Sequence, residues 1–213
     1  MDELDLLKQD WKRKEQELPK LSYDDIHKMI WKRSSSIVKW IFVISILEFL
    51  FWGLISFTLK DSEGMEAYNS IKDLTLMKVL TYFGNAALFV FILLFFMNYR
   101  RISTIDNAKT LMKNILRTRK TVNYYVWFNL VYFVIFSFVI IFLEMNYDEQ
   151  LIQLHDEFAA KGNETMFYTV IYGMSFIFVI IFAVVIWLFY RLIYGILLKK
   201  LNKNYKELKQ IEV

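Results

Sequence analysis

Four long apolar stretches dominate this chain and limit what it can fold into. They cover residues 37–59, 77–97, 122–143 and 166–198, and each reaches the roughly 20 residues that a helix needs to cross a hydrocarbon core of about 30 Å. With 56% hydrophobic residues in 213, the chain is also more apolar than a soluble domain of its size. We therefore predict an all-α integral membrane protein with four transmembrane helices.

The remaining composition supports helix and excludes several kinds of site. The fourth stretch is longer than a bilayer requires, so we expect it to tilt or to continue as a helix beyond the membrane. The single proline and six glycines argue against long flexible linkers and β-rich domains. The absence of cysteine removes disulfides, thiol catalysis and thiolate metal sites.

Charge between the apolar stretches predicts the orientation, because lysine and arginine are retained on the cytoplasmic side. The loop 98–121 has seven basic residues against one acid, and the tail 199–213 is also basic. The loop 144–165 is acidic, with a single lysine. We therefore place both termini in the cytoplasm and the acidic loop outside. No secretory leader is expected, and the predicted location is a bacterial cytoplasmic (inner) membrane.

Residues 1–36 are predicted to form a short cytoplasmic arm of two amphipathic helical segments that meet at Pro19. Ser22 and Asp25 have the spacing of a capping box, which marks the start of the second segment. Such an arm cannot bury enough apolar surface to fold alone. It could pack against the basic loop and the end of the fourth stretch, bind a soluble protein, or lie on anionic lipid. The candidate apolar contact set for a protein partner is Leu7, Trp11, Ile26, Met29, Ile30 and Trp31.

The two other polar segments have simple expected roles. In the basic loop, an apolar stripe through Ile102, Ile105, Ala108, Met112 and Ile115 leaves most cations on the opposite side. These cations could attract lipid phosphates or an acidic protein, but setting the topology explains them more simply, and no motif for specific nucleic-acid binding accompanies them. In the acidic loop, Asp148 to Phe158 is predicted to form a short helix closed by Gly162.

Glu48 is the one carboxylate near the middle of an apolar stretch. An ionised side chain is costly there, so Glu48 should face the bundle and be neutral or hydrogen-bonded. It could serve as a proton or cation relay, as a hydrogen-bonding residue between helices, or as a contact for lipid or a small ligand. Judged by depth alone, its candidate partners are Asn85, Tyr132 and Ser175.

The sequence contains no pattern that predicts catalysis. The two histidines, His27 and His155, fall on opposite sides of the membrane in the predicted topology and cannot share a metal ion. Neither lies in a metalloprotease motif, and no glycine-rich phosphate loop or nucleophile elbow occurs. We therefore expect no enzyme and no cofactor.

The segments LSYDDIHKMIWKRSSSIVKWIFVISILEFLFW (21–52) and TRKTVNYYVWFN (118–129) resemble a four-span membrane protein family of Flavobacteria and related Bacteroidota. Members are often called β-carotene monooxygenases, which implies an iron site with four histidines. This chain has two histidines, so we reject that chemistry. More loosely, the arm resembles the cytoplasmic part of membrane-anchored anti-sigma factors, which implies a sigma factor as partner.

Taken together, these patterns favour a non-enzymatic inner-membrane regulator or scaffold that binds a cytoplasmic protein through residues 1–36. A sigma factor is the most specific candidate for that partner. The alternative is a small channel or transporter, formed as a homo-oligomer, that uses Glu48 in its path. A third class is a lipid-handling enzyme, which should yield a detectable product in membrane extracts.

Overall fold

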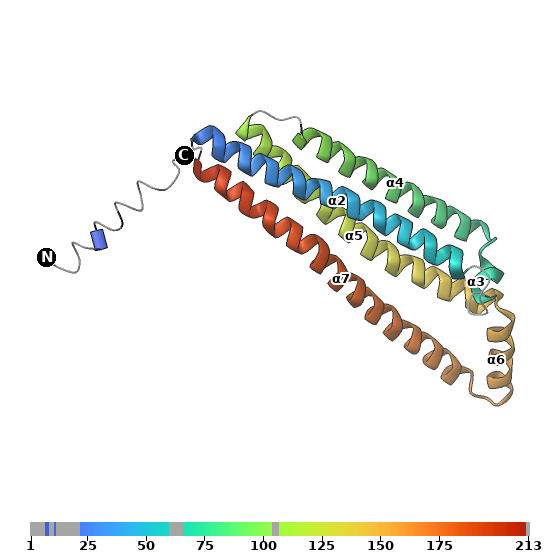
Figure 1. The fold of residues 1–213 in the computed structure, drawn as a ribbon. Helices are drawn as coiled ribbons and strands as arrows, with labels where there is room; N and C mark the ends of the chain where they lie inside the picture. Colours follow the sequence, from blue (N-terminus) through green and yellow to red (C-terminus); the bar gives the residue numbers. More distant parts are fainter. Residues whose placement is uncertain (1–6, 9–10, 12–21, 60–65, 104–106, 212–213) are drawn as a thin grey trace.

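A computed structural model describes residues 7–8, 11, 22–59, 66–103 and 107–211 (Figure 1). Every regular element in that part of the chain is a helix. The four long helices are α2 (Tyr23–Leu59), α4 (Thr75–Ser103), α5 (Ala108–Tyr147) and α7 (Glu164–Ile211). Two short helices are α3 (Glu66–Ile71) and α6 (Glu149–Ala160).

The long helices form a four-helix bundle in which α2 and α5 each pack against both α4 and α7. All four are long and apolar enough to cross a membrane, which confirms the predicted fold class. The chain is thus a multi-pass membrane protein. The start of α2 and the end of α7 lie at one end of the bundle, called here the basic end, and α3 and α6 lie at the other, the acidic end (Figure 1).

The helices continue well beyond the apolar stretches at the basic end. Helix α2 starts at Tyr23 and α7 runs on to Ile211, so the expected helical continuation of the fourth stretch is confirmed. The predicted basic loop 98–121 is largely helical, since α4 ends at Ser103 and α5 begins at Ala108. Asn107 caps α5 by accepting a hydrogen bond from the backbone N–H of Lys109 at 2.9 Å.

These extensions pack as the core of a soluble helical bundle would. We call this packing the basic-end core. Its members come from all four long helices, and each is at most 6% exposed: Ile30, Val38, Ile102, Ala108, Leu111, Ile115, Leu201 and Leu208. Ile102, Ala108 and Ile115 of the predicted stripe belong to it and Met112 packs on its edge, whereas Ile105 lies outside the described residues.

The capping box predicted at the start of α2 is confirmed. The Ser22 hydroxyl accepts a hydrogen bond from the backbone N–H of Asp25 at 3.2 Å, and the Asp25 carboxylate accepts one from the backbone N–H of Ser22 at 3.2 Å. The second arm segment is therefore the first part of α2, continuous with the first apolar stretch. Pro19, where the two arm segments were predicted to meet, lies outside the described residues.

The acidic end carries the predicted short helix, α6. Asp148 caps it by accepting a hydrogen bond from the backbone N–H of Leu151 at 2.9 Å. Gly162 has a φ of 71°, a left-handed conformation that favours glycine, and it ends the helix as predicted. Toward this end α7 separates from α2 (Figure 1), and the side chains of α2 from Phe49 to Thr58 are exposed apart from Ile55.

Candidate functional site

Glu48 is held by tyrosines from two neighbouring helices. Tyr190 of α7 donates a hydrogen bond to Oε1 of Glu48, and Tyr194, one turn further along α7, donates to Oε2 at 3.3 Å. Tyr125 of α5 brings a third hydroxyl to the same carboxyl group. We call Tyr125, Tyr190 and Tyr194 the tyrosine cluster. Glu48 therefore faces the bundle and is hydrogen-bonded, as predicted for a carboxyl group in this position.

Edge-to-face packing fixes the rings of the tyrosine cluster. The Tyr125 ring lies 5.9 Å from the rings of Tyr190 and Tyr194, at 72° and 75° to them. Phe91 and Phe95 of α4 pack on the other edges of Tyr125 at 5.3 Å. Such T-shaped contacts favour one ring orientation, so the three hydroxyls are aimed at Glu48 by packing from three helices.

A small cavity of about 30 Å³ lies beside Glu48, which is about the volume of one water molecule. Its polar lining is Ser45, Glu48, Tyr125 and Asn129. Ser45 donates to the carbonyl of Phe42 at 2.7 Å and Asn129 to that of Tyr125 at 2.8 Å, so both bond within their own helices. The rest of the lining, Phe49, Trp52, Leu88 and Ile92, is largely apolar.

The partners of Glu48 that depth suggested are corrected by this geometry. Among the described residues, Glu48 meets the tyrosine cluster instead of Asn85, Tyr132 or Ser175. The fourth apolar stretch is much longer than the first, so its middle does not lie at the depth of Glu48. Counted from the basic end, Glu48 is 11 residues into the first stretch, and Tyr190 and Tyr194 are 8 and 4 residues into the fourth.

Each of the three suggested residues lies elsewhere in the bundle. Asn85 is exposed on α4. Ser175 lines an apolar groove of about 550 Å³ between α5 and α7. Tyr132 of α5 packs against α4, where its hydroxyl donates to the carbonyl of Leu80 at 2.9 Å.

Gly84 makes the approach of Tyr132 to α4 possible. A Cβ at position 84 would lie 2.6 Å from Cζ of the Tyr132 ring, far inside van der Waals contact. No sequence pattern indicates this role, because the glycine and the ring that covers it lie on different helices.

Buried polar pairs tie the helices together at the basic end. The Asn204 amide of α7 donates to the Ser34 hydroxyl of α2 at 3.0 Å, with both residues buried. The Asn98 amide of α4 donates to Thr121 of α5 at 3.1 Å. Because a buried polar group is costly unless it is paired, these bonds fix the lateral order of the helices there.

The predicted partner-contact set divides into exposed and packed residues. Leu7 and Trp11 are 69% and 75% exposed, and Met29 is also exposed. The other three belong to the bundle: Ile30 is buried in the basic-end core, Ile26 and Trp31 pack against it, and Trp31 Nε1 donates to the carbonyl of Ile102 at 2.7 Å.

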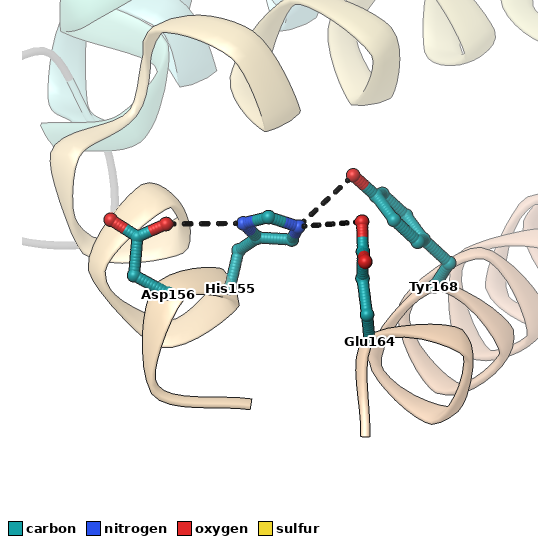
Figure 2. A network of polar contacts seen from close by, with 4 residues as sticks. All are labelled: His155, Asp156, Glu164 and Tyr168. Carbon is teal, nitrogen blue, oxygen red and sulfur yellow. Dashed lines mark hydrogen bonds and ion pairs between the residues drawn. The ribbon is translucent and has the colours of Figure 1, made fainter. Parts of the chain in front are cut away.

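The acidic end carries its own polar network around His155 of α6 (Figure 2). The imidazole Nδ1 lies 3.3 Å from Asp156, and Nε2 lies 3.5 Å from Glu164 and 3.2 Å from the Tyr168 hydroxyl. Phe167 packs edge-on against the imidazole at 5.3 Å. The network fastens α6 to the start of α7.

Within the described residues no group of three or more histidine and acidic side chains could hold a metal ion.

An ion pair lies at the acidic end, where Lys78 Nζ is 2.9 Å from Asp73. The hydrogen bond between them, together with the lysine charge, lowers the pKa of Asp73. Both side chains are exposed, so the pair adds little to stability.

The tyrosine partners of Glu48 were missed from the sequence, although a signal existed. Tyr190 and Tyr194 are four residues apart, so they share one face of a helix. Their two hydroxyl groups lie within an apolar stretch and therefore need hydrogen-bond partners there. Tyr190 and Tyr125 also lie near the ends of apolar stretches, where aromatic rings are ordinarily explained by the membrane surface.

Comparison with known proteins identifies a family for this chain. A family model described as a domain of unknown function (DUF8845) matches residues 24–213. No curated protein and no solved structure matches the chain.

Proposed function

The chain belongs to the family described as a domain of unknown function (DUF8845), and from its own residues we propose that it is a non-enzymatic membrane scaffold or regulator. In this proposal a cytoplasmic protein binds at the basic end. The observation that carries the proposal is the basic-end core, and in the arm Leu7 and Trp11 are exposed.

The length of the helices supports this function. Crossing a bilayer takes roughly 20 residues, yet α2 has 37, α5 has 40 and α7 has 48. The extra turns are not apolar throughout. They build a packed core with hydrogen-bonded polar pairs, which is the construction of a rigid soluble platform.

The exposed residues narrow the contact set. Large aromatic side chains are common anchors of protein interfaces. In the arm, Trp11 is exposed, and so is Leu7, four residues before it in the sequence. Ile30 and Trp31 support the bundle instead, so their substitution would test folding. The proposed partner contacts are therefore Leu7, Trp11 and Met29.

The test is purification of the tagged protein from its native host in mild detergent, followed by mass spectrometry of the co-purifying proteins. Wild type is compared with the Leu7→Ala/Trp11→Ala double variant and with a chain lacking residues 2–20, which leaves α2 intact. The control is Trp127→Ala, which removes an exposed tryptophan from the third apolar stretch.

We expect a stoichiometric soluble partner with wild type and Trp127→Ala that is depleted at least about tenfold with the other two chains, because an interface anchor contributes 2 kcal/mol or more by order of magnitude. If that partner is a sigma factor, the result supports the most specific version of the proposal, an anti-sigma factor. Identical sets of co-purifying proteins in all four samples would refute it.

A second candidate function, a channel or transporter through Glu48, is favoured by the carboxyl group and the cavity beside it. Conduction needs polar groups along a whole path, and the lining around Glu48 is apolar on its other sides. Ion or proton flux into proteoliposomes that is abolished by Glu48→Gln would support this function; absence of flux from folded wild type would reject it.

A further inference from the structure

A pocket of about 440 Å³ lies between α2 and α7 at the basic end. Helix α2 contributes Lys32, Arg33, Ser36 and Ile37 to its lining, and α7 contributes Lys200, Lys203 and Asn204. Four of these seven residues are cationic and none is acidic. From this arrangement we infer that the pocket binds the phosphodiester headgroup of an anionic phospholipid. This site is independent of the protein-binding function proposed above.

The net positive charge of the pocket favours binding of an anion. Glu207 lies 3.8 Å from Lys203 on the same helix, and the Lys203 side chain is 78% exposed, so this pair is weak and screened by solvent. Even with Glu207 counted, three of the four positive charges remain uncompensated among the described lining residues. The like charges around the pocket repel one another, and a bound phosphate relieves that repulsion. The Arg33 guanidinium can donate two parallel hydrogen bonds to the phosphate.

The fold holds these cations together. The buried hydrogen bond from Asn204 to Ser34, at 3.0 Å, joins the two helices at the pocket itself. The hydrogen bonds from Tyr190 and Tyr194 to Glu48 join them a second time further along. Because the two helices are fixed at the pocket and again on its membrane side, the cations project from a rigid backbone, and little backbone ordering is needed when an anion binds.

The depth of the pocket favours a lipid over a soluble anion. The first apolar stretch begins at Ile37 and the fourth ends at residue 198, so the lining coincides with the level at which headgroups meet the hydrocarbon. One turn deeper on the same faces, Trp40 and Ile196 are 57% and 55% exposed. Acyl chains attached to the bound phosphate can lie against them. Basic pockets between membrane helices are a known form of site for anionic headgroups.

The test is native mass spectrometry of the purified full-length protein with added phosphatidylglycerol. Phosphatidylcholine, which carries the same phosphodiester with a compensating cation, serves as the lipid control, and inorganic phosphate serves as the soluble anion. The pocket variant replaces Lys32, Arg33, Lys200 and Lys203 by Gln. The matched variant replaces three lysines and one arginine elsewhere at the basic end by Gln: Lys109, Lys113, Arg117 and Lys120.

We expect wild type and the matched variant to retain one phosphatidylglycerol, and the pocket variant to bind it at least about tenfold more weakly. Phosphatidylcholine and inorganic phosphate should bind at least about tenfold more weakly to wild type. Equal losses in the two quadruple variants would show general surface attraction only and would overturn the site. Equal retention of phosphatidylcholine would also overturn it, and inorganic phosphate binding as tightly as the lipid would show a soluble-anion site instead.

A single substitution keeps the test independent of the folding of the quadruple variant. Ser36→Phe leaves every cation in place and puts a bulky ring into the pocket, and Ser36 is exposed, so the bundle can accept the ring. We expect it to lower phosphatidylglycerol retention about as strongly as the quadruple variant. Full retention in Ser36→Phe would place the lipid outside this pocket and overturn the inference.

Discussion

The hydroxyl groups that contact Glu48 can be removed one at a time by tyrosine-to-phenylalanine substitution. Tyr190→Phe keeps the ring packing and removes the hydrogen bond to Glu48. We expect the free energy of unfolding to fall by about 1 kcal/mol, the usual size of a hydrogen bond between membrane helices. Unfolding in detergent micelles measures it, with Tyr124→Phe, an exposed tyrosine next to the cluster, as the control.

A double-mutant cycle identifies the partner. Combined with Glu48→Gln, the loss from Tyr190→Phe should shrink, with a coupling energy of order 1 kcal/mol between the two sites. If the losses simply add, the hydroxyl of Tyr190 does not stabilise the bundle through Glu48.

Gly84 and Gly53 form a matched pair of helical glycines. A Cβ at Gly84 would collide with the Tyr132 ring, whereas one at Gly53 meets nothing within 4 Å. Gly84→Ala should therefore displace Tyr132 and its hydrogen bond to Leu80, and destabilise the protein by about 1–3 kcal/mol. Gly53→Ala should be neutral or slightly stabilising, because alanine is the better helix former.

Thermal unfolding of both glycine variants in the same detergent checks this expectation. Equal stability of the Gly84 and Gly53 variants would mean that α4 and α5 can separate without loss, contrary to the close packing of Tyr132 on α4.

Some of these residues could be identified from sequence and others could not. Glu48 stood out because a carboxyl group inside an apolar stretch must face the bundle. Its partners did not, since they depend on how far α2 and α7 slide past one another. The need for glycine at position 84 comes from a ring on another helix, and no local pattern encodes such a contact.

Among the elements, the first turns of α2 link folding to the proposed interface. Trp31 is bound to the end of α4 through its hydrogen bond to Ile102, while Trp11 is exposed. Trp31→Phe should lower the free energy of unfolding by about 1–2 kcal/mol, because a part-buried carbonyl loses its donor. Trp11→Phe should leave stability unchanged. Urea or thermal unfolding of the two variants distinguishes these roles, and equal stabilities would show that Trp31 does not support the bundle.

The helices themselves were predictable where one physical effect dominated. Apolar length fixed the four spans, and the caps at Ser22 and Asp148 and the glycine at 162 marked three ends. The charge of the segment 98–121 predicts a basic loop on the cytoplasmic side, but not that most of it is helical. Its apolar stripe, seen in Ile102, Ala108 and Ile115, was the stronger signal: it needed only the neighbouring helices to bury it.

For the molecule as a whole, the absence of cysteine makes the topology directly testable. Lys113→Cys and Asp156→Cys each place a single thiol on an exposed position at opposite ends of the bundle. A membrane-impermeant maleimide should label Asp156→Cys in intact spheroplasts and Lys113→Cys only after lysis, as the charge distribution predicts. The reverse pattern would invert the orientation, and labelling of both in intact cells would contradict the four-span topology.

The extension of α2 past the apolar stretch has an electrostatic consequence. From Ser36 back to Tyr23, at 1.5 Å per residue, the helix covers roughly 20 Å. That is more than twice the Debye length of about 8 Å at physiological ionic strength. The surface potential of anionic lipid has therefore decayed almost completely at the start of α2. A protein docked there would experience the charge of the bundle end and not that of the membrane, so its own net charge need not be positive.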